Sequence, residues 1–261
     1  MDGTKFKVES GIQLLSRLTA KKTKIENFYP NLFGSGPKYG DIIEIFSNRS
    51  SSFLLIDIIC EALLPMELGG AESGVLILNT DGHITLQALT ALLQLKLLSR
   101  RKFNSNIECT EMLKQVLDNL YIQDIFDDFQ LNTTLQKLDY VLAQHNNISL
   151  CIIDTFTAFY WSEHRFKMVK MDSYLKKLLR VLQKSTKSHE IAIIYTRPDY
   201  FNSSKDQRDN LEACCENPTV EKINCRVELL FNEDKTWTAN ISLFNNNSKR
   251  NFRYVHNQIY W

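Results

Sequence analysis

The sequence predicts one α/β fold in which a mainly parallel central sheet is flanked by helices and ends in antiparallel strands. Apolar runs of strand length recur at 75–79, 148–154 and 190–196, as parallel strands buried on both faces require. Segments of helical periodicity separate these runs, which is the order that parallel crossovers produce. After residue 222, three strand-like runs follow one another with no helical segment between them, and this indicates an antiparallel meander.

Length and composition limit the function classes. The 261 residues suffice for one core domain, which we place at 40–261, behind an N-terminal helix and linker at 1–39. A formal net charge of +1 gives no overall attraction to nucleic acid or membrane. We read no signal peptide and no transmembrane-length apolar run, so we expect an intracellular protein. The six cysteines are scattered, which fits reduced thiols; the pair Cys214 and Cys215 has no CxxC or histidine neighbour to suggest a metal site.

The first elements lie before the core. Ser10–Leu18 has the pattern of a short amphipathic helix with Ser10 as its cap, and a basic run follows it. Residues 31–40 are rich in glycine and proline and predict a linker.

Residues 40–65 predict a strand, a tight turn and a buried helix. Asp41–Phe46 has the pattern of a strand, and Phe53–Leu64 is apolar nearly all round, so this helix should lie inside the fold. A phosphate-binding loop at such a turn needs GxxxxGK[ST], because glycine amides wrap the phosphates and a lysine neutralises them. The turn here has neither glycine nor lysine; its six residues are Ser47, Asn48, Arg49, Ser50, Ser51 and Ser52. The serines at 50–52 offer side-chain oxygens that cap the helix.

The next elements alternate. Helical spacing over 84–98 ends in a basic run, and cations are stabilising at a helix C-terminus. The stretch 109–128 predicts a helix followed by a short strand near 120–125, and helical spacing returns over 131–145. The strand 148–154 ends in Asp154, at the edge of a parallel sheet that faces the ligand crevice.

The last third contains a helix, a loop and the meander. Residues 172–184 predict a helix with a basic outer face, and 197–222 predict a long polar loop. We place the three final strands at Cys225–Phe231, Thr236–Phe244 and Asn251–Gln258.

Several short motifs carry a resemblance to a known family. They occur in the family's order and rough spacing: VESGIQLLSRL, PNLF, GDIIE, LNTD, IIDTFTAFYW and IIYT. From about Val8 to Thr196 the chain resembles the RecA-like recombinases, and among them the paralogues that form no filament. The resemblance implies a RecA-like P-loop NTPase core, here with a degenerate phosphate loop.

The resemblance also implies roles for single residues. Asp154 matches the aspartate that helps to hold Mg²⁺, Asp81 falls where the catalytic glutamate stands, and Arg197 falls at the γ-phosphate sensor. The phosphate-binding lysine has no counterpart. We therefore expect a pseudo-ATPase without catalytic residues, for which ATP and Mg²⁺ are not expected as cofactors.

The family resemblance implies a non-catalytic subunit that helps to assemble a nuclear complex for homologous-recombination repair of double-strand breaks. The implied partners are the D-type recombinase paralogue and, through it, the B- and C-type paralogues. Candidate docking residues lie in the N-terminal helix and linker: Ile12, Leu14, Leu15, Leu18 and Phe33. The alternative for this segment is packing on the chain's own core.

Other functions stay open from the sequence. One is single-stranded or branched DNA binding within the complex through Arg165, Lys167 and Lys170, which lie among aromatic residues suited to base stacking. Others are a residual ATP-binding, DNA-dependent ATPase, or an unrelated α/β enzyme, although HExxH, GxSxG and dinucleotide motifs are missing. The aromatic run 156–161 can be core or interface.

Overall fold

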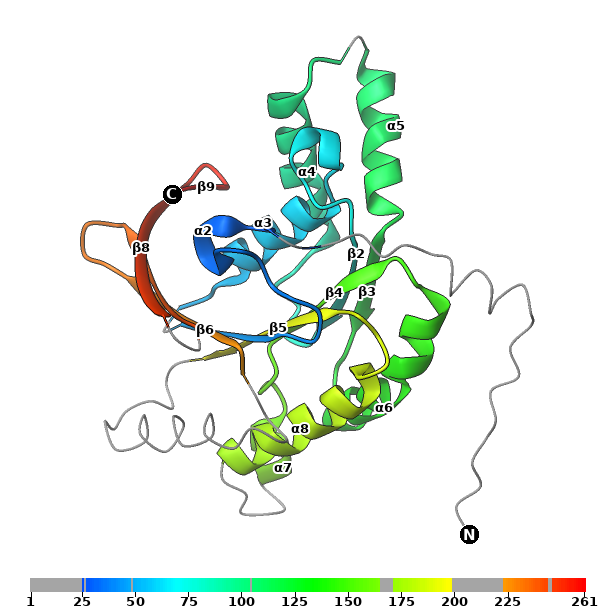
Figure 1. Ribbon diagram of the computed structural model, residues 1–261, viewed down its shortest axis with the longest axis vertical. Helices are drawn as coiled ribbons and strands as arrows, with labels where there is room; N and C mark the ends of the chain where they lie inside the picture. The colour runs from blue at the N-terminus through cyan, green and yellow to red at the C-terminus, as the bar shows by residue number, and fades with distance from the viewer. Residues whose placement is uncertain are drawn as a thin grey trace.

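The computed structural model describes residues 25, 27–47, 49–103, 105–164, 171–198, 223–243 and 246–261. In these residues one sheet of nine strands runs through the molecule in the order β3-β2-β4-β5-β1-β6-β7-β8-β9 (Figure 1). The strands are β1 (Ile42–Ser47), β2 (Gly74–Asn79), β3 (Leu120–Asp124), β4 (Ile148–Asp154), β5 (Ala192–Pro198), β6 (Cys225–Phe231), β7 (Trp237–Leu243), β8 (Asn246–Val255) and β9 (Gln258–Tyr260).

Strand pairing confirms the predicted mixture. The strands β3, β2, β4, β5, β1 and β6 pair in parallel, with Ile43 of β1 opposite Ile194 of β5 and Cys225 of β6. The pairs β6–β7, β7–β8 and β8–β9 are antiparallel. The parallel part carries the crossover helices, and the meander extends the sheet on one side.

Helices cover both faces of the parallel part. They are α2 (Pro30–Phe33), α3 (Ser52–Leu63), the 3-10 turn η1 (Met66–Leu68), α4 (Leu86–Arg100), α5 (Asn106–Leu117), α6 (Asp128–Gln144), α7 (Tyr160–His164) and α8 (Met171–Thr186). One core cluster joins α2, α3 and α4 to the sheet, and a second joins α6, α7 and α8 to its other face (Figure 1). All seven residues of β4 are buried because both faces are covered.

The last part of the predicted N-terminal segment packs into the main core. Phe28, Leu32 and Phe33 belong to the same core cluster as α3. Gly36 has a positive φ of 88°, and a Cβ there would lie 2.5 Å from the backbone nitrogen of Asn27, so this bend requires glycine. Residues 1–24, with the predicted helix Ser10–Leu18, lie outside the described residues.

Three predicted boundaries need correction. Arg197 and Pro198 lie in β5 and not in a loop, and β1 extends to Ser47 while α3 starts at Ser52, so only residues 48–51 connect them. The predicted strand Asn251–Gln258 has the wrong bounds, because residues 251–255 belong to β8 and Gln258 begins β9. His256 and Asn257 both have positive φ, 49° and 61°, and turn the chain between β8 and β9. A two-residue turn of this kind requires positive φ at both positions, and histidine is a weak signal for it.

No helix among the described residues combines the length and the apolar character needed to cross a bilayer.

Candidate functional site

The candidate site is a cavity of about 310 Å³ at the carboxyl edge of the parallel strands. Its wall includes the turn between β1 and α3, the ends of β4 and β5, and the residues that follow β2. The chain folds this way because parallel strands with helical crossovers bring several strand ends and one helix N-terminus to a single edge. The backbone amides of Thr80 and Asp81 donate to the carbonyl of Asp154 at 2.7 and 3.2 Å, which holds two of these segments together.

The turn between β1 and α3 is closed by its own side chains. Ser47 Oγ donates to the carbonyl of Leu229 at 3.2 Å and accepts from the amide of Arg49 at the same distance. The hydroxyls of Ser50 and Ser52 lie 3.0 Å apart and share a hydrogen bond. Ser51 occupies the N-cap of α3, but its side chain makes no capping hydrogen bond. The predicted capping of this helix by a serine hydroxyl is therefore wrong. Asn48 lies outside the described residues.

Both arginines that line the cavity beside this turn contact residues outside it. The Arg49 guanidinium lies over the ring of Phe231, 4.2 Å from its centroid. Arg197 Nε donates to Glu44 Oε1 at 2.8 Å, and its guanidinium lies 5.0 Å from the centroid of the Phe46 ring. None of these contacts involves a serine hydroxyl of the turn.

The placement of Arg197 follows from strand alternation. Thr196 reaches Asp154, whereas its neighbours Tyr195 and Arg197 both contact Glu44, because successive side chains of a strand point to opposite faces. The sequence placed Arg197 at the sensor position. In the structure its side chain lines the cavity and forms a buried ion pair with Glu44.

Glu44 is the centre of that buried cluster and only 1% exposed. Oε1 accepts from the Tyr195 hydroxyl at 2.8 Å as well as from Arg197, and Oε2 lies 3.0 Å from Arg226 Nε. Burial alone would raise the pKa of Glu44, but the positive charges of Arg197 and Arg226 outweigh it and leave the pKa lowered. Sequence analysis missed this cluster; its one signal was an acidic residue inside the apolar run IIEIF.

The two carboxylates at the cavity have different surroundings. Asp154 is 5% exposed; Oδ1 accepts from Thr196 Oγ1 at 2.5 Å, while Oδ2 has no hydrogen-bond partner among the described residues. Burial, with the nearby charge of Asp81, raises the pKa of Asp154. Asp81 is more open, and His83 Nδ1 lies 3.8 Å from its Oδ2. Burial also raises the pKa of Asp81, an effect that His83 opposes.

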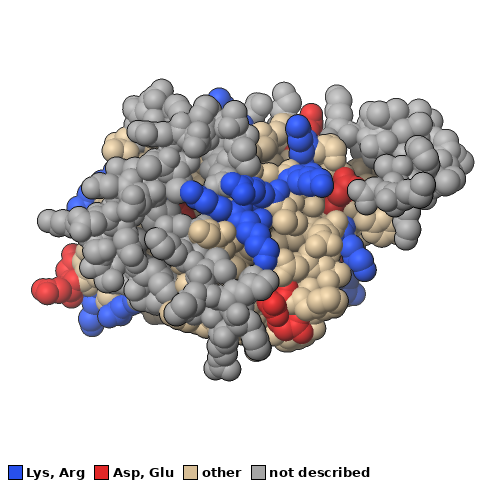
Figure 2. Space-filling model, turned by 90° about the horizontal axis from the view of Figure 1, so that it is seen from below, with Lys and Arg blue, Asp and Glu red and all other residues tan. Residues whose placement is uncertain are grey.

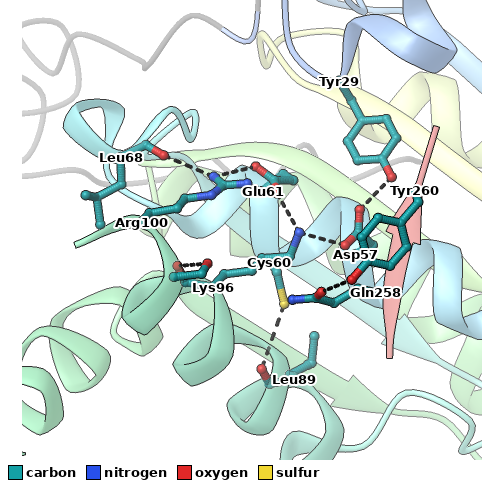
Figure 3. Close-up of polar contacts among 11 residues, drawn as sticks. Tyr29, Asp57, Cys60, Glu61, Leu68, Leu89, Lys96, Arg100, Gln258 and Tyr260 are labelled. Carbon is teal, nitrogen blue, oxygen red and sulfur yellow. Dashed lines mark hydrogen bonds and ion pairs between the residues drawn. The ribbon is translucent and has the colours of Figure 1, made fainter. Parts of the chain in front are cut away.

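The sequence also missed a second charged cluster, which ties α2, α3 and α4 together (Figure 3). Lys96 Nζ lies 2.7 Å from Asp57 Oδ1 and 2.6 Å from Glu61 Oε1, and Arg100 also pairs with Glu61. The Tyr29 hydroxyl donates to Asp57 Oδ2 at 2.6 Å. Burial by itself would lower the pKa of Lys96, but Asp57 and Glu61 raise it. The signal was available, since acids four residues apart on one apolar helix match bases four residues apart on the next.

The structure describes few of the predicted surface residues. Arg165, Lys167 and Lys170 lie outside the described residues, as do Ile12, Leu14, Leu15 and Leu18. Phe33 is described and is 4% exposed, so it packs on the chain's own core, the alternative left open by the sequence. The aromatic run is divided: Phe156 is fully buried, whereas Trp161 is 55% exposed.

Comparison with known proteins decides the family. A model described as Rad51 matches residues 17–205, most of the chain. The chain belongs to the Rad51 family. The RecA-like fold predicted from the sequence is thereby confirmed, with its mainly parallel sheet and its antiparallel C-terminal strands.

Curated relatives agree with this family assignment. The chain is 25% identical to the DNA repair protein XRCC2 of Mus musculus over 210 residues, which are 78% of this chain and 72% of that protein. It is 19% identical to the DNA repair and recombination protein RadB of Methanobrevibacter smithii over 184 residues, 70% of each chain. It is 23% identical to the DNA repair and recombination protein RadA of Metallosphaera sedula over 206 residues, 76% of this chain and 60% of RadA.

In this Rad51-family chain, the two carboxylates that the resemblance singled out both line the cavity. The predicted sensor arginine also borders it, and its Nε donates to Glu44. Among the described residues, no group of three or more histidine, cysteine, aspartate or glutamate side chains is placed to hold a metal ion.

Proposed function

We propose that this chain is a non-catalytic subunit of a recombinase-paralogue complex that acts in homologous-recombination repair of DNA double-strand breaks. Family membership supports the setting, since its relatives carry the names of DNA repair and recombination proteins. The proposal includes a nuclear location and the D-type paralogue as direct partner, with the B- and C-type paralogues reached through it.

The turn between β1 and α3 carries the non-catalytic part of the proposal. Phosphoryl transfer depends on positioning and on stabilising charge, and loss of one preorganised donor costs about 3 kcal/mol in an acyl-transfer enzyme. Here residues 48–51 contain no glycine and no lysine. The guanidinium of Arg49 rests on Phe231, and that of Arg197 pairs with Glu44. These residues do not fit MgATP.

Nucleotide binding tests this directly. We expect a fluorescent ATP analogue with Mg²⁺ to show no saturable binding to the full chain at micromolar concentration, and the same flat titration with Asp154→Asn. Saturable binding that Asp154→Asn abolishes would establish a nucleotide site and end the pseudo-ATPase proposal.

Assembly is tested by co-purification with the D-type paralogue. Because Phe28, Leu32 and Phe33 are buried in the core, a truncation that probes docking must end before residue 25. We expect loss of the complex when residues 1–24 are deleted, and when Leu14→Asp and Leu15→Asp are combined in the full chain. Unchanged recovery of the partner in both cases would remove this segment from the interface.

A basic helix face supports DNA contact as a second function of the same subunit. Residues 165–187 hold eight of the chain's 31 basic residues and one of its 30 acidic residues. On α8, Leu175, Leu178 and Leu182 are buried, while Lys177 and Lys184 are exposed. Figure 2 shows Lys and Arg side chains gathered near the middle of the face seen from below, the side of the sheet on which α6 and α8 lie.

Salt dependence tests the DNA contact. We expect the affinity of the assembled complex for single-stranded DNA to fall steeply with salt. The slope of log binding constant against log salt concentration should become shallower by roughly 1 to 2 when Lys177→Ala and Lys184→Ala are combined. Lys102→Ala with Lys114→Ala, two exposed lysines just after α4 and on α5, on the other side of the sheet, serves as the matched control. An unchanged slope in the α8 variant would rule out this face.

A further inference from the structure

Two carboxylates stand on the wall of the cavity at the carboxyl edge of the sheet. In a phosphate-binding cavity, lysine and amide groups face an anion. Here the cations at the turn have other partners, Phe231 for Arg49 and Glu44 for Arg197, while Asp81 and Asp154 keep their carboxylates at the cavity wall. The wall therefore carries two carboxylates beside the guanidinium groups of Arg49 and Arg197, whereas the charged groups that a working phosphate loop presents are cations.

Asp154 supplies the decisive observation. Its side chain is 95% buried, its Oδ1 is satisfied by Thr196, and its Oδ2 has no hydrogen-bond partner in the described part of the chain. A buried carboxylate oxygen left without a donor is costly, so such atoms are rare in native proteins unless a ligand or partner completes them.

The rest of the wall suits a group that donates hydrogen bonds. Ser50, Ser51 and Ser52 contribute hydroxyl oxygens that can accept, and Asp81 stands at the open side with its carboxylate 32% exposed. The N-terminus of α3 opposes a cation with about half a positive charge, and this effect falls off within the first turn of the helix. The two carboxylates oppose this effect, and the two arginines of the wall have partners outside the cavity, Phe231 for Arg49 and Glu44 for Arg197.

We propose that this cavity receives the ammonium or guanidinium group of a lysine or arginine side chain from a partner protein, which pairs with Asp154 Oδ2 and Asp81. This inference deepens the proposed function, because it assumes that the chain works as a subunit. A basic side chain occupies the place that MgATP has in an active recombinase, and it completes a carboxylate that the chain alone leaves unpaired.

The test compares Asp154→Asn with Asp118→Asn, which changes an exposed carboxylate at the end of α5. In the isolated full chain, Asp154→Asn should raise the thermal unfolding midpoint by about 2–4 °C, because it removes an unpaired buried charge. In the complex with the D-type paralogue, the same variant should weaken binding by about 30-fold or more. Asp118→Asn should change neither quantity.

A role in partner binding predicts that Asp154→Asn stabilises the isolated chain but weakens the complex, whereas a structural role predicts a loss of both. Loss of both stability and affinity in Asp154→Asn would make Asp154 a structural residue and overturn the inference, as would a complex of unchanged affinity. If the wild-type chain forms no complex with the D-type paralogue, the proposed function fails by itself. The site is then tested with ethylguanidinium chloride against sodium chloride at equal ionic strength. Stabilisation of the wild type but not of Asp154→Asn supports a cation site for a free ligand, and no stabilisation overturns it.

MgATP is the remaining competitor. Saturable stabilisation of the wild-type chain by MgATP, lost in Asp154→Asn, would overturn both the cation site and the proposed function.

Discussion

Glu44 and Asp154 are two buried carboxylates on neighbouring regions of one sheet, and their surroundings are opposite. Glu44 faces two arginines and a tyrosine hydroxyl, and its pKa is lowered in spite of burial. Asp154 has one threonine donor, a carboxylate nearby and an unpaired oxygen, and burial raises its pKa. The contrast separates a charge that stabilises the fold from one that the fold tolerates for a ligand or partner.

The largest expected effect comes from removing Glu44. Glu44→Ala leaves Arg197 and Arg226 without their counter-charge in a buried position, and should reduce the free energy of unfolding by about 3–5 kcal/mol. Urea denaturation measures it, with Glu111→Ala on the exposed face of α5 as control. A loss no larger than that of the control would mean that the cluster is not structural.

Substitution of Lys96 tests whether the charged cluster in Figure 3 stabilises the fold as the Glu44 cluster does. Lys96→Met keeps the aliphatic chain but leaves Asp57 without its cation, while Arg100 still neutralises Glu61. We expect a loss of about 2–3 kcal/mol by urea denaturation. Lys114→Met, on the exposed side of α5, is the control and should stay close to wild type.

Asp154→Asn should raise the free energy of unfolding, whereas Glu44→Ala and Lys96→Met should lower it. The amide keeps the size of the side chain and removes an unpaired buried charge, so we expect a gain of about 1–2 kcal/mol in the free energy of unfolding. Destabilisation in the same urea experiment would place Asp154 with Glu44 and remove the contrast between them.

The smallest expected effect is that the stability gained by Asp154→Asn depends on pH. Because the pKa of Asp154 is raised in the folded chain, its unfavourable contribution is present at neutral pH and disappears as the pH falls through its folded pKa. The stability of the wild type should therefore approach that of Asp154→Asn in mildly acidic urea titrations. Glu44, with a lowered pKa, keeps its stabilising contribution above the ordinary pKa of a glutamate and loses it as the pH falls from there through its folded pKa. If Asp154→Asn raised the free energy of unfolding equally at every pH, the buried charge of Asp154 would not be the cause of the gain.

Local patterns were enough for much of the fold. The apolar run Ile148–Asp154 specified β4 with the observed bounds, and the all-round apolar helix after the serine turn was recognised as buried. These features depend on periodicity and burial within one segment, which a sequence displays directly. The same holds for the missing glycines and lysine of the turn, because an absent residue needs no structure to be seen.

Side-chain partners across the sheet were beyond the sequence. Glu44 and Arg197 are 153 residues apart, and only the pairing of β1 with β5 in a fixed register brings them together. The face on which Arg197 lies depends on that register, since a shift by one residue would exchange the two faces of the strand. Sequence by itself determined most of the elements and showed that the turn after β1 contains no glycine and no lysine. Tertiary structure alone decided which charges are paired, because the pairing joins strands that are neighbours in space and distant along the chain.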